Sequence, residues 1–292
     1  MFSDTHFHYE QTTRSRGTDG VCVLRSLLER NTFFAQDIGT HCDDLKSRAE
    51  VLETDIAALP EHIQEKARAM IFLSAGIWPA PEAIVERERQ VAELERHICE
   101  AKNADGISRK IVSLGECGLD RHWNKNGADC RDEATFSSEM LHGECELFEM
   151  QLLLAQKLSL PVIVHSRDAA DETLSCIKNC GYDNGIIHCF SYGKKEAESF
   201  LDRGWYISFS GSITYTKKSH IDAMRELLNY IPKDKILFET DSPYLAPVPL
   251  RGSVNNPANV QYVYQYAADL LLMRAEELSE IADKNIKTLY SL

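Results

Sequence analysis

Six side chains that can bind a metal ion stand at the ends of short apolar runs in the sequence. They are His6, His8, Glu116, His165, His188 and Asp241. A single histidine in such a place is more often structural, and an aspartate before Ser-Pro can simply form a turn. That explanation is poor for six residues in equivalent places. Imidazole and carboxylate ligands together favour zinc, manganese, iron or cobalt, with magnesium as a further candidate where water completes its shell.

The number of these ligands indicates two ions rather than one. An open catalytic site for one ion usually has three protein ligands and a water, so six ligands exceed its needs. Two ions about 3.5–4 Å apart lower the pKa of a shared water and clamp the attacking and leaving oxygens of a displacement. We therefore expect two divalent ions, such as zinc, magnesium or manganese. The other six histidines lie in loops or helical patterns, and we interpret them as structural.

The elements that must position these ligands are eight β-rich runs separated by helical patterns. The runs are 1–7, 32–37, 70–76, 111–116, 161–165, 185–188, 205–209 and 236–240. Strands that alternate with helices pair in parallel through right-handed crossovers, and eight such units predict a TIM (β/α)8 barrel. An open doubly wound sheet is the alternative. The barrel is expected as a single domain over residues 1–292.

In such a barrel the carboxyl ends of the strands meet at one mouth, where catalytic residues collect. His6 and His8 are two residues apart, so the alternation of a strand places both on one face. Glu116 is expected to close the fourth strand, where the flanking glycines would allow a tight turn. The polar stretch 122–142 is predicted to be a loop insertion at the mouth, either solvated or acting as a lid. Residues 256–292 are predicted to form two helices.

Composition narrows the class of protein. The 292 residues include 32 Lys+Arg and 45 Asp+Glu, a formal net charge of −13, which argues against a protein that coats a phosphate backbone with cations. Nine cysteines without a CxxC pair favour reduced thiols and a cytoplasmic location. The beginning of the sequence has no secretory signal pattern, and no apolar run of roughly 18 residues predicts a membrane span. No protein partner is evident.

Five ordered strings resemble the TatD family of metal-dependent deoxyribonucleases. They are Asp4–His8, Gly115–Asp120, Val164–Ala169, His188–Ser191 and Glu239–Pro247, and the similarity continues through Arg251 to about Asn285. The resemblance implies an amidohydrolase-type barrel that hydrolyses phosphodiester bonds in DNA, often from the 3′ end.

The resemblance also implies a role for each ligand. His6 and His8 would hold the first metal, Glu116 would bridge, and His165 and His188 would hold the second. Asp241 would bind the first metal and take the proton from the attacking water. Asp241 and Glu116 are accordingly the expected catalytic carboxylates.

Departures from the family pattern and a basic rim define the expected substrate contacts. Trp78 stands where the family commonly has histidine, and Tyr192 stands where it usually has glycine, so both are expected at the mouth. Arg167 and Arg251 lie inside the matched motifs and are expected to bind phosphates. Cations with nearby aromatic side chains suit a few nucleotides of single-stranded DNA or a 3′ end.

Two other functions are compatible with the same residues. The first is hydrolysis of another ester or amide on the same barrel, for instance in an aminoacyl-tRNA. The second is a non-catalytic metal or nucleic-acid binding protein.

Overall fold

A computed structural model describes residues 2–122 and 137–292, and its eight strands form one sheet in which each strand pairs in parallel with the next. The strands are β1 (Asp4–Phe7), β2 (Ala35–Asp37), β3 (Ile71–Ala75), β4 (Ile111–Asp120), β5 (Val162–Arg167), β6 (Gly185–Ile187), β7 (Tyr206–Phe209) and β8 (Ile236–Phe238). A bridge between Phe7 and Ser242 joins β1 to the segment after β8. The predicted barrel is confirmed, and the open doubly wound sheet is excluded.

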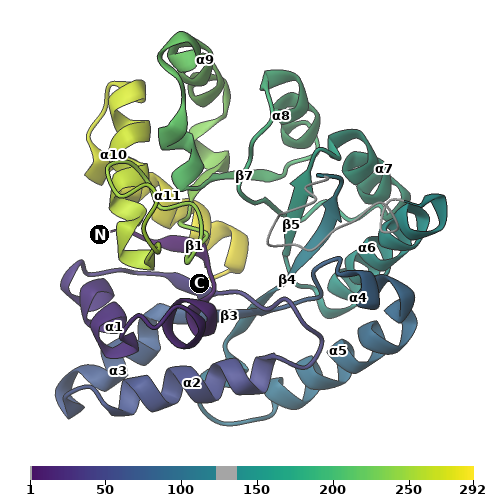
Figure 1. Cartoon of the computed structure of the whole chain (residues 1–292), viewed down its shortest axis with the longest axis horizontal. Helices are drawn as coiled ribbons and strands as arrows, with labels where there is room; N and C mark the ends of the chain where they lie inside the picture. Colours follow the sequence, from purple (N-terminus) through teal and green to yellow (C-terminus); the bar gives the residue numbers. More distant parts are fainter. Residues whose placement is uncertain (1, 123–136) are drawn as a thin grey trace.

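Helices surround the ring of strands (Figure 1). They are α1 (Gly20–Glu29), α2 (Leu45–Ala57), α3 (Glu61–Met70), α4 (Pro81–Val85), α5 (Arg87–Lys102), α6 (Ser138–Leu158), α7 (Ala170–Cys180), α8 (Lys194–Leu201), α9 (Ile221–Tyr230), α10 (Val260–Leu271) and α11 (Ala275–Tyr290). The last two confirm the two helices predicted over 256–292. No helix of the described ranges has both the length and the apolar character that crossing a bilayer requires.

The barrel is closed at the end opposite the mouth by α11. Ile286, Leu289 and Tyr290 of α11 form a buried cluster with Phe34 and Tyr206, which lie at or before the amino ends of strands. Figure 1 shows the chain end marked C near the middle of the ring of strands. Because α11 covers the amino ends of the strands, a site can open only at their carboxyl ends.

The fourth strand differs from its predicted bounds. It continues through Glu116 to Asp120, and its pairing with β5 shifts register between Leu114 and Cys117. Gly118 has φ of 139°, and a Cβ there would lie 2.0 Å from the carbonyl oxygen of His165. The glycine therefore allows close approach of β5 and an irregular ladder, instead of the turn that we expected to end the strand. Most of the predicted insertion 122–142 lies outside the described residues.

Candidate metal centre

The six predicted ligands come from five different places around the barrel and meet at its mouth. His6 lies in β1 and His8 just after it, Glu116 lies within β4, and His165 lies in β5. His188 follows β6, and Asp241 follows β8 by three residues. Because neighbouring parallel strands end at one edge of the barrel, residues up to 235 positions apart in the sequence become neighbours here.

One half of the site is formed by His6, His8, Asp241 and one oxygen of Glu116. The Nε2 atom of His6 lies 3.3 Å from Oε2 of Glu116 and 3.7 Å from Oδ1 of Asp241. The Nε2 atom of His8 lies 3.7 Å and 3.5 Å from the same two oxygens. His8 turns its Nδ1 toward the carbonyl oxygen of Ile38 at 3.4 Å, which leaves Nε2 as the nitrogen that faces the carboxylates.

The other half is formed by His165, His188 and the second oxygen of Glu116. Oε1 of Glu116 lies 3.0 Å from Nδ1 of His165 and 3.1 Å from Nε2 of His188. The two imidazole nitrogens are 3.3 Å apart. Glu116 therefore offers one oxygen to each half, which is the arrangement of a carboxylate that bridges two cations.

The chemistry of these donors fits divalent cations. Both ring nitrogens of His6 are buried, and neither has a hydrogen-bond partner among the described residues. Burying a polar atom without a partner is costly, so such an atom points to a ligand. His6, His8 and Glu116 bring one ligand atom each within 4.8 Å of one another, and so do Glu116, His165 and His188. All the donors are nitrogen or oxygen, as borderline divalent ions prefer.

Two carboxylates behind the ligands fix which nitrogen of each histidine faces the centre. Oδ2 of Asp120 lies 3.0 Å from Nε2 of His165, so Nδ1 faces Glu116. Oε1 of Glu239 lies 3.1 Å from Nδ1 of His188, so there Nε2 faces the centre. Such outer carboxylates orient metal-binding histidines and hold their tautomer.

Our sequence reasoning gave neither Asp120 nor Glu239 a role, although both stand in the quoted strings. The alternation of a strand carries the missing signal. Asp120 is four residues after Glu116, and Glu239 is two residues before Asp241, so each shares a face with a predicted ligand. The sequence motif is thus informative on the outer carboxylates as well as on the ligands.

Buried hydrogen bonds tie β1 to the segment that carries Asp241. Asp4 accepts hydrogen bonds from the Thr240 hydroxyl at 2.6 Å, the Thr240 N–H at 3.0 Å and the His6 N–H at 3.1 Å. The Asp241 N–H donates to the carbonyl of His6 at 2.9 Å. Burial raises the pKa of Asp4 well above its ordinary value despite these bonds. The ties fix the spacing between His6 and Asp241.

The pKa values of the side chains in the centre depend on burial and on the attraction between carboxylates and imidazolium rings. Burial opposes charge on Glu116, but the surrounding histidines, led by His188, hold the pKa of that carboxyl well below its usual value. Burial also opposes charge on His165, yet Asp120 and Glu116 raise its pKa to about 9. The pKa of His6 is lowered by burial and by neighbouring His188. Binding of a cation here therefore competes with imidazolium protons.

The predicted substrate residues occupy different parts of the rim. The Arg251 guanidinium lies over the Tyr215 ring, 4.3 Å from its centroid. The Arg167 side chain is 42% exposed, with Nη1 3.9 Å from Asp120. The Trp78 ring stands edge-on to His165, with centroids 6.0 Å apart.

Tyr192 is held more firmly than a residue free at the mouth. Its hydroxyl lies 2.9 Å from the Ser166 hydroxyl and accepts the Ala169 N–H at 3.0 Å. Burial raises the pKa of this phenol. The hydroxyl is therefore already engaged within the protein, and the ring stands edge-on to Phe190, with centroids 5.6 Å apart.

Comparisons with known proteins agree with this geometry. The sequence profile of the family described as "TatD related DNase" matches residues 3–291. The uncharacterized metal-dependent hydrolase YabD of Bacillus subtilis is 33% identical over 227 residues, which cover 76% of this chain and 78% of that protein. A Rahnella protein named "3'-5' ssDNA/RNA exonuclease TatD" is 33% identical over 62% of this chain and 66% of its own. The crystal structure of the Escherichia coli TatD homolog YJJV has a TM-score of 0.77 at 23% identity, covering 100% of this chain and 98% of that one.

Proposed function

This chain belongs to the TatD family and is a metal-dependent hydrolase, and from that premise we propose that it cleaves phosphodiester bonds in DNA, removing nucleotides from the 3′ end of a single strand. The observation that carries the proposal is the position of Glu116, which presents Oε2 to His6 at 3.3 Å and Oε1 to His165 at 3.0 Å. A bridging carboxylate of this kind supports a pair of divalent ions, such as zinc, magnesium or manganese. A pair of ions suits phosphodiester hydrolysis because it supplies a Lewis acid for the phosphate and lowers the pKa of the attacking water.

The protein side chains bind the ions and accept the proton of water. In our proposal His6, His8 and Asp241 hold the first ion, His165 and His188 hold the second, and Glu116 bridges. Asp241 receives the proton of the attacking water. The Asp241 side chain is 16% exposed against 6% for Glu116, so Asp241 is the carboxylate of the pair that water reaches more easily. Its φ of 55° is a conformation that aspartate tolerates better than most residues.

The substrate contacts follow from charge and shape at the rim. Arg167 and Arg251 are placed in our proposal against backbone phosphates, and Trp78 and Tyr192 against bases. The name of the Rahnella relative, which refers to single-stranded DNA and RNA, supports a nucleic-acid substrate. We further propose that residues 1–292 work as a single domain in the cytoplasm. The eight described cysteines are free thiols, as a reducing compartment requires.

A substrate panel with a single variant tests the proposal. Single-stranded DNA labelled at either end, RNA, and an aminoacyl ester are each incubated with magnesium, manganese or zinc. Asp241→Asn is expected to lower kcat on DNA by more than about a hundredfold, because the amide cannot accept the proton of water. Asp105→Asn, at an exposed position away from the centre, is the matched control and keeps parental kcat.

Metal content and circular dichroism are measured on both variants. A folded, metal-loaded Asp241→Asn protein with parental kcat would contradict the role of Asp241. Turnover of the aminoacyl ester with none of DNA or RNA would replace the proposed substrate class by the ester.

A further inference from the structure

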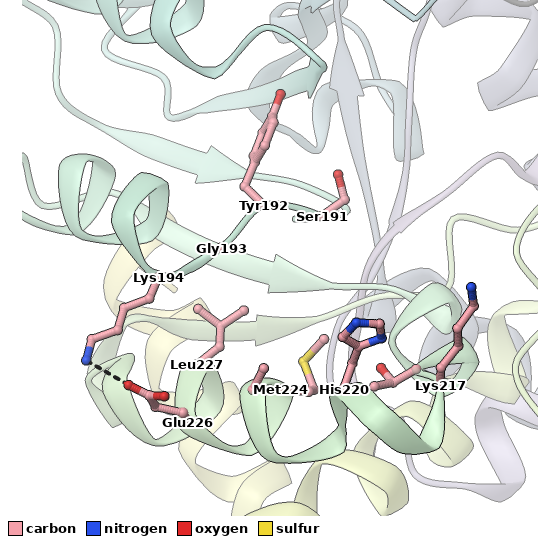
Figure 2. A pocket seen from close by; sticks show the side chains of 11 residues that line it. Ser191, Tyr192, Gly193, Lys194, Lys217, His220, Met224, Glu226 and Leu227 are labelled. Carbon is pink, nitrogen blue, oxygen red and sulfur yellow. Dashed lines mark hydrogen bonds and ion pairs between the residues drawn. The ribbon is translucent and has the colours of Figure 1, made fainter.

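A cavity of about 570 Å³ lies between the loop that follows β6 and the segment that leads into α9. Its lining includes Tyr192, Lys194, Lys217, His220, Met224 and Leu227. Figure 2 shows Lys194 and Lys217 toward opposite ends of this space, with His220, Met224 and Leu227 between them. We refer to it as the α8/α9 cavity.

The lining of the α8/α9 cavity is cationic, although the whole chain has a formal net charge of −13. Lys217 is exposed, and no carboxylate of the described residues lies within ion-pair distance of it. The acid in the lining, Glu226, is paired with Lys194 at 3.1 Å. Charges farther away than about 8 Å are screened at physiological salt, so a bound anion experiences mainly this local excess of positive charge.

The floor of the cavity is apolar and partly aromatic. Leu227 is buried and Met224 is half-buried, and the ring of His220 lies beside them. Tyr192 also belongs to the lining, but Figure 2 shows its ring directed away from these side chains, and its hydroxyl is bonded to Ser166 and Ala169. Planar and polarisable side chains next to flexible cations are the combination that binds a base and its phosphate in single-stranded nucleic acid.

The cavity is also connected to the metal centre through the protein. Ser191 in its lining is three residues after the ligand His188, a separation of at most about 11 Å along the chain. Tyr192 reaches with its hydroxyl to Ser166, the residue after the ligand His165. This short connection would let a strand whose scissile phosphate lies at the metal centre continue past Ser191 into the cavity.

We propose that the α8/α9 cavity is a subsite for the continuing strand of a single-stranded polynucleotide, beyond the nucleotide that is removed. A phosphate of that strand lies against Lys217, and its base packs against His220 and Met224. The inference rests on the proposed function and sharpens it, because it makes the preferred substrate a chain of several nucleotides and not a dinucleotide.

The test compares two single-stranded DNA substrates, an octamer and a dinucleotide, using the full chain loaded with metal. Lys217→Ala is expected to raise KM for the octamer about three- to tenfold and to leave kcat and the dinucleotide KM unchanged. One fewer phosphate contact should also reduce the salt slope of octamer binding by about 0.7. Ala223→Glu, at an exposed lining position, introduces a negative charge and should act in the same direction more strongly.

Lys218→Ala is the matched control, because Lys218 is the exposed neighbour of Lys217 and is not part of the lining. Equal octamer KM in the Lys217 and Lys218 variants, or a parent enzyme that shows no preference for the octamer, overturns the subsite while phosphodiester hydrolysis stands. Fluorescence anisotropy of a labelled octamer in chelator gives a readout independent of turnover. Octamer binding that weakens in Lys217→Ala supports the subsite even if the parent hydrolyses no DNA, a result that would overturn the proposed function alone.

Discussion

Replacing the two outer carboxylates separately should weaken the second metal position by different amounts. Asp120 uses both of its oxygens to accept hydrogen bonds, one from the His122 N–H at 2.8 Å and one from Nε2 of His165 at 3.0 Å. In Asp120→Asn the amide must turn its NH₂ toward one of these donors. If it faces His165, the imidazole loses the partner that keeps Nδ1 free to bind a cation.

Replacing Glu239 by glutamine is expected to weaken metal binding less than Asp120→Asn does. Oε1 of Glu239 accepts from Nδ1 of His188 at 3.1 Å and from the Cys189 N–H at 2.8 Å, and its Oε2 accepts from the Ser208 hydroxyl at 2.6 Å. In Glu239→Gln the oxygen can stay toward His188 while the NH₂ faces Ser208, whose hydroxyl can rotate to accept. This variant therefore loses the negative charge but retains the tautomer of His188.

The expected magnitude follows from that difference. Outer-carboxylate variants commonly lose about 10- to 100-fold in metal affinity, which corresponds to roughly 1.4–2.7 kcal/mol. We place Asp120→Asn near the upper end, because its amide conflicts with a fixed N–H donor. We place Glu239→Gln near the lower end. The first metal position should change less than twofold in Asp120→Asn, since the two hydrogen bonds described for Asp120 come from His122 and from His165 of the second position.

Competition with a chromogenic chelator measures both dissociation constants for manganese or zinc in the parent and the two variants. Circular dichroism confirms that each variant is folded. The reasoning is refuted if Asp120→Asn retains both parental constants, or if Glu239→Gln binds the weaker-held ion less tightly than Asp120→Asn does.

Two further predictions concern the ions and the irregular strand. Elemental analysis of the metal-saturated protein should give two ions per chain, and one ion at saturation would contradict the bridging role of Glu116. Removing the ions with a chelator should lower Tm, because a ligand at a hundred times its dissociation constant stabilises the folded protein by about 2.7 kcal/mol. Gly118→Ala should destabilise the fold by at least about 3 kcal/mol in denaturant unfolding, because its Cβ would lie 2.0 Å from the His165 carbonyl oxygen. Gly181→Ala is the control, since Gly181 also has a positive φ, 63°, but a Cβ there would have nothing within 4 Å. If Gly181→Ala lost as much free energy of unfolding as Gly118→Ala, the backbone conformation and not the contact with His165 would be responsible.

The eight strands could be predicted because each is a short apolar run between helical patterns, and parallel pairing follows from that alternation. Every predicted run contains the start of an observed strand, from Asp4 in the first to Ile236 in the eighth. The end of β4 could not be predicted in the same way. Gly115 and Gly118 indicate a backbone that departs from regular geometry, but glycine is equally suited to a turn and to a close approach between strands. Only the position of the β5 carbonyl at His165 decides between them.

The ligands could be predicted because their residue types and places at strand ends are unusual together, whereas the orientation of the rim could not. The sequence places Tyr192 close to His188, but the direction of its hydroxyl depends on Ser166, 26 residues earlier in the chain. In the same way, nothing in the local sequence indicates that Arg251 lies over Tyr215. Side chains on loops take their direction from neighbours in space, which a linear pattern does not contain.

Closure of the barrel and assembly of the first metal position use the same contacts. The His8 N–H donates to the carbonyl of Ser242 at 2.8 Å, and the Asp241 N–H donates to the carbonyl of His6 at 2.9 Å. These bonds join the first strand to the segment after the last, and they also bring His6 and His8 each within 4 Å of Asp241. Because Asp4 reinforces the same junction, an error in barrel closure would misplace three ligands together. The metal centre is therefore positioned by the feature that defines the fold, which explains why its ligands are so far apart in the sequence and so close in the structure.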